Sequence, residues 1–291
     1  MCERKIRKKI KKKNIMEEKK SIRLKHSLAS KGYVGPVVIG VLSQFFIISL
    51  LSGMIADFLP AFFDEYHIVE LGLSILALIF FKFWFRPEYK GSIAFGNWDN
   101  KLIVAILIVC IIDVLSVALT GEFSWENFNL ETLLMAVAIG FNEETFLRII
   151  PIALMCRNKN SQKNIMKIII ISAVVFGMMH LPNMFMGASV GVTILQIVTS
   201  TCSGLFYGAM FMYTGSFIPS VAAHAIHDFI CSLDVSSNAS DGTMVANLTG
   251  DIFIEEGITI VIKILFTLYI LRPVVREAIE KLWEYKWSKE G

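Results

Sequence analysis

Two adjacent glutamates and an arginine lie within an apolar stretch of the chain, GFNEETFLRII from Gly140 to Ile150. An ionisable side chain near the centre of a bilayer costs about 2.5 to 3.5 kcal/mol on insertion scales, so each one requires a physical reason. Glu144 and Arg148 are four residues apart, which makes them neighbours on one helical face where they can neutralise each other. Glu143 points about 100° away from Glu144 around the helix and has no such partner. Glu143 is therefore the first candidate for chemistry.

Matching polar groups occur on two later apolar segments. FGMMH places Phe176 and His180 four residues apart, and HAIHD does the same for His224 and Asp228. A packing explanation must account for each residue separately, whereas one inward-facing site explains them together. A glutamate in a low-dielectric pocket can act as a general base near neutral pH, and histidines can orient water, stabilise an oxyanion or bind a metal. We predict that Glu143, His180 and His224 converge around one water molecule.

The elements that must position these residues are membrane helices. The chain has 291 residues, of which 55% are hydrophobic and 18% charged, with a mean hydropathy of +0.60. A soluble domain of this length is less apolar and more charged. One crossing of a bilayer core of about 30 Å needs about 20 apolar residues. The sequence predicts an all-α, polytopic helix bundle with about eight transmembrane spans, near residues 34–59, 68–85, 102–120, 132–156, 164–181, 185–213, 216–232 and 257–272.

Basic residues are concentrated in alternate loops. Thirteen of the 28 Lys and Arg residues lie between Arg4 and Lys31, and others follow in 82–101, 157–167 and after residue 271. Loops 60–67 and 121–131 and segment 233–256 contain none. This alternation is the positive-inside pattern, and it predicts a multi-pass protein of the plasma membrane with both termini in the cytoplasm.

Three regions follow from these patterns: a basic N-terminal segment at 1–33, a transmembrane bundle at 34–272 and a cytoplasmic tail at 273–291. A basic run beside a first span is typical of contact with anionic lipids, which we favour over RNA binding, so no nucleic-acid partner is expected. The five cysteines show no CxxC spacing and are predicted to be reduced packing residues. A ladder of small residues at Ser200, Gly204 and Gly208 is predicted to let another helix approach closely.

Two charges lie outside these motifs, at Asp113 and Lys263. Each is predicted to lie about 10 Å below the outer surface of its span. One hypothesis is a structural salt bridge between the third and eighth spans. The alternative is that Lys263 extends alone toward the surface.

The three motifs EExxxR, FxxxH and HxxxD, in this order on predicted membrane helices, resemble those of the CAAX-protease and bacteriocin-processing (Abi) family of intramembrane endopeptidases. The resemblance covers roughly residues 130–232. It implies that Glu143 activates water and that His180 helps to position it. It further implies that His224 and Asp228 stabilise the oxyanion or bind a metal, and that the site's shape depends on supporting residues, namely Glu144, Arg148 and Phe176. The substrate would be a membrane-associated peptide or protein, cleaved in peptide maturation or in self-immunity against a bacteriocin.

One position departs from the prenyl-protease branch, which generally has asparagine where this chain has Asp228. CAAX specificity therefore does not follow from the motifs. Glu143, His180, His224 and Asp228 are sufficient in kind for zinc or another divalent metal with an open coordination position. Alternatively, Asp228 stays protonated, or as an ionised side chain it orients His224 and favours its imidazolium form, an oxyanion partner that needs no metal; we favour the last of these roles.

Two functions from other classes compete with the endopeptidase. A non-catalytic membrane scaffold or immunity protein would keep the fold and regulate a partner, but such a protein is expected to lose some of the motif residues. A proton-coupled transporter would also use buried carboxylates and histidines, but the sequence shows no internal repeat of the kind that many transporters have.

Overall fold

The computed structural model describes residues 11–13, 15–16, 19, 27–60, 67–86, 88–96, 99–120, 123–233 and 250–287. All regular elements in this part of the chain are helices, which confirms the predicted all-α class. In chain order they are η1 (Leu28–Ser30), α2 (Val34–Ser43), η2 (Gln44–Ser52), α3 (Gly53–Ala56), α5 (Ile68–Trp84), α6 (Asn100–Thr120), α7 (Leu130–Glu144), η3 (Thr145–Ile149), α8 (Ile150–Met155), α9 (Lys159–Gln162), α10 (Ile165–Met178), η4 (Leu181–Met186), α11 (Val190–Thr214), α12 (Ile218–Cys231), α13 (Gly250–Ile270) and α14 (Pro273–Lys286).

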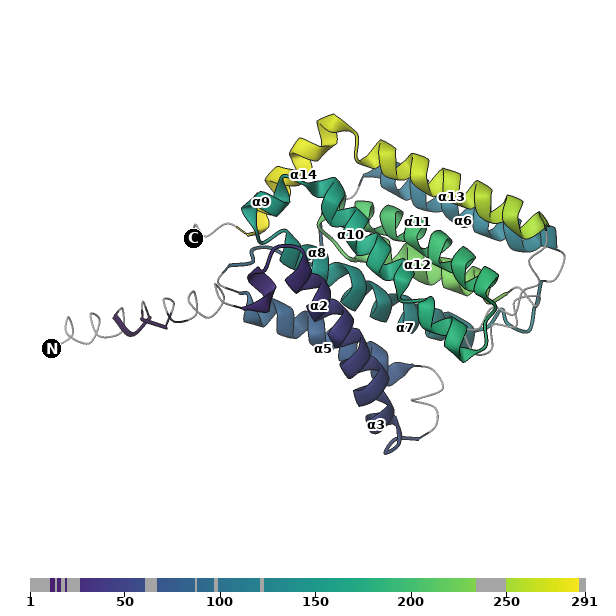
Figure 1. The fold of residues 1–291 in the computed structure, drawn as a ribbon, viewed down its shortest axis with the longest axis horizontal. Helices are drawn as coiled ribbons and strands as arrows, with labels where there is room; N and C mark the ends of the chain where they lie inside the picture. The colour runs from purple at the N-terminus through teal and green to yellow at the C-terminus, as the bar shows by residue number, and fades with distance from the viewer. Residues whose placement is uncertain are drawn as a thin grey trace.

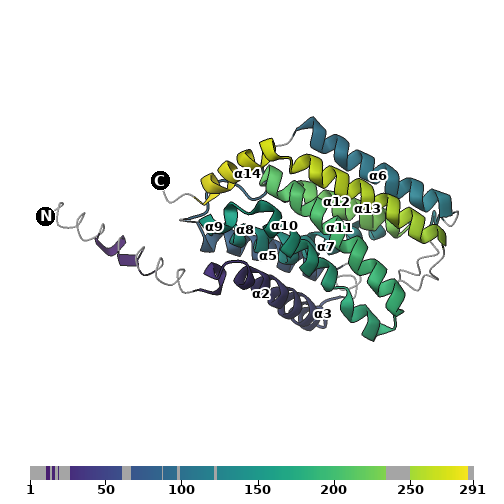
Figure 2. The ribbon, with the colours of Figure 1, turned by 45° about the horizontal axis from the view of Figure 1, so that its top comes forward.

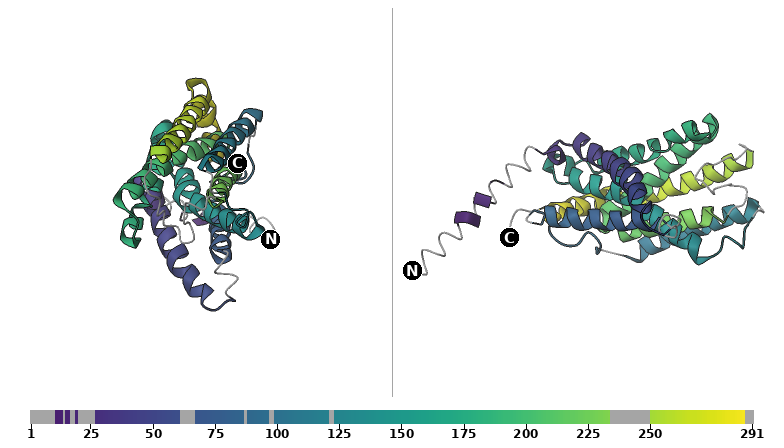
Figure 3. Two further views of the ribbon diagram at one scale, coloured as in Figure 1. Left: turned by 90° about the vertical axis from the view of Figure 1, so that its right-hand side faces the viewer. Right: turned by 90° about the horizontal axis from the view of Figure 1, so that it is seen from below.

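The helices form a bundle whose centre is α11. This helix packs against α10, α12 and α13, while α12 also packs against α7 and α6 (Figure 1). The last long helix, α13, lies beside α6 in both Figure 1 and Figure 2, although about 150 residues separate them along the chain. Figure 1 shows α2 and α5 on the flank of the bundle away from α13, and in the left view of Figure 3 α2 likewise lies at the lower side and α13 at the upper side. Helices α7, α10, α11, α12 and α13 are therefore the ones that can form a shared interior.

A helix lies in each of the eight predicted spans, but the number of eight crossings is not confirmed. Within the described residues, three helices are long and apolar enough to cross a membrane: Val34–Ala56, Ile165–Met186 and Val190–Thr214. A fourth crossing is added if the pair Glu256–Ile270 and Pro273–Lys286, bent by 69°, counts as one span. The shortfall has a physical reason, since α12 has only 14 residues and so extends about 21 Å, less than a bilayer core.

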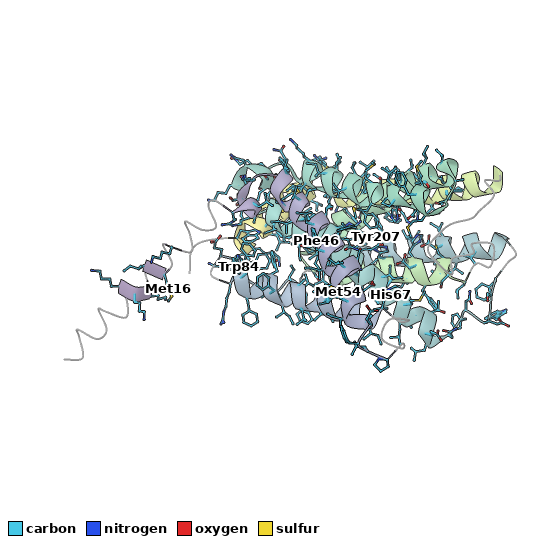
Figure 4. All side chains as sticks on the ribbon, turned by 60° about the horizontal axis from the view of Figure 1, so that its bottom comes forward. Met16, Phe46, Met54, His67, Trp84 and Tyr207 are labelled. Atoms are coloured by element: carbon cyan, nitrogen blue, oxygen red, sulfur yellow. The ribbon has the colours of Figure 1, made fainter. Side chains whose placement is uncertain are left out.

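Large apolar side chains cover much of the outside of the bundle. Phe46, Met54 and Trp84, labelled in Figure 4, have exposed fractions of 54%, 57% and 45%. Together with the long apolar helices, this surface is typical of a membrane protein, in which lipid chains contact the exposed apolar side chains. The C-terminal helix α14 instead packs on α9 and α11, and its buried Trp283 donates a hydrogen bond from Nε1 to the carbonyl of Met212 at 2.9 Å.

The segment that carries both glutamates runs without a break from α7 through the π-helical η3 into α8. Asn129 caps its start, accepting a hydrogen bond from the backbone N–H of Thr132 at 2.9 Å. Near its end Pro151 has no N–H for the carbonyl of Leu147, and the hydroxyl of Ser172 on α10 donates to that carbonyl instead, at 3.1 Å. The helix therefore crosses the bundle although it contains a proline.

Glycines set the helix spacing at two contacts that matter for the site. A Cβ on Gly140 of α7 would lie 3.1 Å from the backbone nitrogen of Ala225 on α12. A Cβ on Gly204 of α11 would lie 3.0 Å from the Cα of Ala173 on α10 and 3.2 Å from Nη2 of Arg148. Both contacts are tighter than a side chain normally accepts, so each glycine permits a close approach. The ladder that includes Gly204 therefore packs as predicted, and it also makes room for Arg148.

Candidate active site

Glu144 lies buried between Arg148 and His224. It forms an ion pair with Arg148, one turn along the helix, as the sequence predicts, and both side chains have an exposed fraction of 0%. Its Oε1 lies 2.8 Å from Nδ1 of His224 on α12. Since a carboxylate only accepts, Nδ1 carries the proton and donates it to Glu144. Glu144 thus neutralises the buried arginine and fixes the orientation of the His224 ring.

Glu143 and Asp228 lie on the other side of the same ring. Nε2 of His224 is 3.7 Å from Oε2 of Glu143 and 3.5 Å from Oδ1 of Asp228. Each of these two carboxylates has an exposed fraction of 25%, against 0% for Glu144. Of the two adjacent glutamates, Glu143 is therefore the one that a water molecule can reach.

These groups line a cavity of about 460 Å³. Its wall includes Glu143, His180, His224 and Asp228, so the four residues predicted to act in catalysis face one space. Helices α7, α10, η4, α11, α12 and α13 supply the rest of the wall, which contains Met135, Ile139, Phe176, Asn183, Gln196, Ser203, Tyr207, His227, Cys231, Glu256, Thr259 and Lys263. Glu143, His180 and His224 therefore line one cavity, and their convergence around one water molecule stays a prediction.

Aromatic rings hold the histidines and the arginine in place. Phe176 on α10 makes edge-to-face contacts with His180 and with His224, both at 5.6 Å between ring centroids. The guanidinium of Arg148 lies 4.4 Å from the centroid of the Phe176 ring. The supporting position predicted for Phe176 agrees with these contacts, because one ring touches three members of the motifs.

Tyr207 is a site residue that the sequence motifs do not reveal. Its ring stacks on His224, with centroids 5.2 Å apart and an interplanar angle of 23°, and it lies 5.4 Å from the guanidinium of Arg148. Figure 4 labels Tyr207 inside the bundle. The only signal in the sequence is its place within the small-residue ladder, between Gly204 and Gly208.

His180 stands where α10 ends, just before the short helix η4. Its Nε2 is buried and has no hydrogen-bond partner among the described residues. Beyond it, the side-chain amide of Asn183 donates to Oε1 of Gln196 at 2.8 Å, which ties η4 to α11. His180 is thus held by Phe176 and by the helix end, and its free nitrogen can hold a water molecule.

The predicted salt bridge between Asp113 and Lys263 is wrong. Oδ2 of Asp113 lies 2.9 Å from Nδ1 of His227, and Nζ of Lys263 donates to Oγ of Ser203 at 2.9 Å. The alternative is wrong as well, because Lys263 has an exposed fraction of 2% and does not extend to the surface. His227, which lies outside the three motifs, provides the partner of Asp113.

The described residues contain no group of three or more His, Cys, Asp or Glu side chains placed to hold a metal ion. His224 directs Nδ1 to Glu144, and its Nε2 is flanked by two carboxylates at 3.5 and 3.7 Å, distances at which the groups contact one another. The mechanism proposed below uses protein groups and water, and metal binding by Asp228 is its competing proposal.

Comparison with known families agrees with this site. Residues 102–230 match the family described as "Rce1-like: Type II CAAX prenyl endopeptidase Rce1-like". The matched segment is similar to this family over less than half of the chain. This match confirms the resemblance inferred from the three motifs and extends it to α6, which carries Asp113. It supports a CAAX-type protease activity in the membrane. No curated protein and no solved structure matches the chain.

Proposed function

We propose that this protein is an intramembrane endopeptidase in which Glu143 activates the water that hydrolyses a peptide bond. The observation that carries the proposal is the contrast between the two adjacent glutamates: Glu144 is sealed from the cavity, while Glu143 is a quarter exposed to it. A general base must reach the proton that it abstracts, directly or through one water, and Glu143 meets this condition.

In this mechanism a water molecule lies between Glu143 and the free Nε2 of His180. Glu143 accepts a proton from the water, and the oxygen attacks the peptide carbonyl carbon. Glu143 then passes the proton to the leaving amine nitrogen, so one carboxylate acts as base and then as acid. The cavity is enclosed by helices and has a lower dielectric constant than bulk water, so each of these electrostatic interactions is stronger there than in water.

His224 would stabilise the negative charge that develops on the carbonyl oxygen. Its Nδ1 is committed to Glu144, so only Nε2 faces the cavity. Two carboxylates beside Nε2 favour a proton on that nitrogen, which can then be donated to the oxyanion. Asp228 acts in this scheme by holding His224 in its protonated form. A role for Asp228 as a ligand of zinc or another divalent metal is the competing proposal.

The substrate that fits this site is a membrane-associated peptide or protein segment. An apolar helix bundle admits such a segment from the bilayer, and the outcome is peptide maturation or protection against a self-made bacteriocin. The basic N-terminal segment would bind anionic lipid on the cytoplasmic face of the plasma membrane, with both termini on that side.

Cleavage of a peptide library by purified protein in detergent tests this function. Glu143→Ala is the catalytic control, and Glu131→Ala, an exposed glutamate in the first turn of the same helix, is the matched variant. The proposal requires cleavage by the wild type and by Glu131→Ala but not by Glu143→Ala. Equal cleavage by all three refutes the mechanism. Binding of a partner without cleavage by any of them favours the scaffold or immunity protein.

A further inference from the structure

A thiol and an imidazole lie on the wall of the same cavity, beside the proposed hydrolytic site, and a buried carboxylate behind the wall contacts the imidazole. Sγ of Cys231 lies beside the His227 ring, 3.8 Å from Nε2 and 4.0 Å from Nδ1, and Nδ1 of His227 is 2.9 Å from Oδ2 of Asp113. Asp113 is buried, with an exposed fraction of 5%, so it holds the imidazole firmly. A nucleophile next to a base that is oriented by a third group is the arrangement that activates a cysteine.

The hydrolytic mechanism does not use this cluster. His224 is oriented by Glu144 from α7, whereas His227 is oriented by Asp113 from α6. Cys231 and His227 are four residues apart, so they share one face at the end of α12. Both line the cavity, and the His227 side chain has an exposed fraction of 28%, which leaves room for a small reactant.

We infer that Cys231 is a reactive thiol that exchanges with small disulfides, and that the mixed disulfide obstructs the cavity. In this step Nε2 of His227 accepts the thiol proton, and the thiolate sulfur attacks one sulfur of the incoming disulfide. A new S–S bond forms while the old one breaks, and the leaving thiolate takes the proton back from the imidazolium. The disulfide is the only co-reactant: the Cys231 thiolate supplies the electron pair of the new S–S bond, and the leaving thiolate keeps the electron pair of the bond that breaks.

Obstruction follows from the shared space. The adduct on Cys231 occupies part of a cavity of about 460 Å³ whose wall also contains Glu143 and His224. A peptide that must reach Glu143 then competes with the adduct for volume. This regulatory consequence rests on the proposed function, whereas the reactivity of the thiol does not.

The reactivity is tested on the full chain in detergent with 4,4′-dithiodipyridine. Release of pyridinethione gives the rate, and peptide mass spectrometry locates the adduct. Cys202, partly exposed on α11, and the buried Cys156 are internal comparisons. We expect Cys231 to react about ten-fold faster than Cys202, and His227→Gln and Asp113→Asn each to remove most of that advantage. Equal rates at Cys231 and Cys202, or an unchanged rate in His227→Gln, would overturn the inference.

The effect of the adduct on hydrolysis is tested by measuring cleavage of a peptide substrate. Pretreatment with the probe should abolish cleavage by the wild type and leave cleavage by Cys231→Ser unchanged, while inhibition that persists in Cys231→Ser contradicts it. Glu143→Gln should react at Cys231 at the wild-type rate. If no variant cleaves any peptide, the labelling rates still decide whether the thiol site exists, and only the proposed function fails.

Discussion

Replacing Glu144 with glutamine tests how the buried network is held together. The change removes one charge and keeps the size of the side chain, so Arg148 is left with a guanidinium charge at an exposed fraction of 0%. Breaking a buried ion pair by removing one partner costs about 3 to 5 kcal/mol. The contacts of Arg148 with the rings of Phe176 and Tyr207 exist before and after the change, so they do not offset the loss. We expect Glu144→Gln to destabilise the protein by about that amount.

The assay is reversible unfolding in detergent micelles followed by circular dichroism. Glu131→Gln, at the exposed start of the same helix, is the matched control and should cost less than about 1 kcal/mol. The double variant Glu144→Gln with Arg148→Met should recover most of the stability, because no uncompensated charge remains. If Glu144→Gln is as stable as Glu131→Gln, the buried ion pair between Glu144 and Arg148 does not stabilise the fold.

Three further predictions concern the shape and chemistry of the site. Asp228→Asn should lower turnover without making it sensitive to chelators, because the amide no longer favours a proton on Nε2 of His224; zinc-reversible inhibition of the wild type by chelators would instead make Asp228 a metal ligand. Gly204→Ala should lower the free energy of unfolding by about 1 to 3 kcal/mol, because the added Cβ would contact α10 and Arg148. Gly257→Ala is the control, since an added Cβ there has no heavy atom within 4 Å, and equal effects of the two substitutions would contradict the close packing at Gly204. Tyr207→Phe should match the wild type in its unfolding free energy and peptide turnover. Tyr207→Ala should lower the unfolding free energy by about 3 to 5 kcal/mol, because it removes the ring that stacks on His224. An unchanged unfolding free energy in Tyr207→Ala would show that this stacking does not stabilise the fold.

Spacing within one helix was enough to predict the local part of the site. Glu144 and Arg148 pair because they lie four residues apart, and the helix lies where the apolar pattern puts it. Phe176 and His180 share a face for the same reason. Motif order on successive spans also indicated that Glu143 and His224 meet, because polar groups in an apolar bundle gain by sharing one cavity.

Contacts between distant helices were not available from spacing. Depth in the membrane suggested a pair between Asp113 and Lys263, but depth says nothing about rotation around the helix axis, and Asp113 contacts His227 instead. The role of Tyr207 could not be predicted, because a tyrosine among apolar residues is typical of ordinary core packing, and only the structure shows its ring stacked on His224. The number of crossings was overestimated for a related reason: a hydropathy pattern counts apolar segments, whereas a crossing also needs length, which the 14-residue α12 lacks.

The most direct test of the central claim is the turnover of a cleaved peptide by Glu143→Gln. Glutamine keeps the shape of the side chain but cannot accept the proton from water, and Glu143 is partly exposed to the cavity, so stability should change by less than about 1 kcal/mol. If Glu143 is the general base, kcat of Glu143→Gln should fall by about 10² to 10⁴-fold while the unfolding midpoint stays unchanged. Turnover by a folded Glu143→Gln protein at the wild-type rate would contradict the assignment of Glu143 as the base.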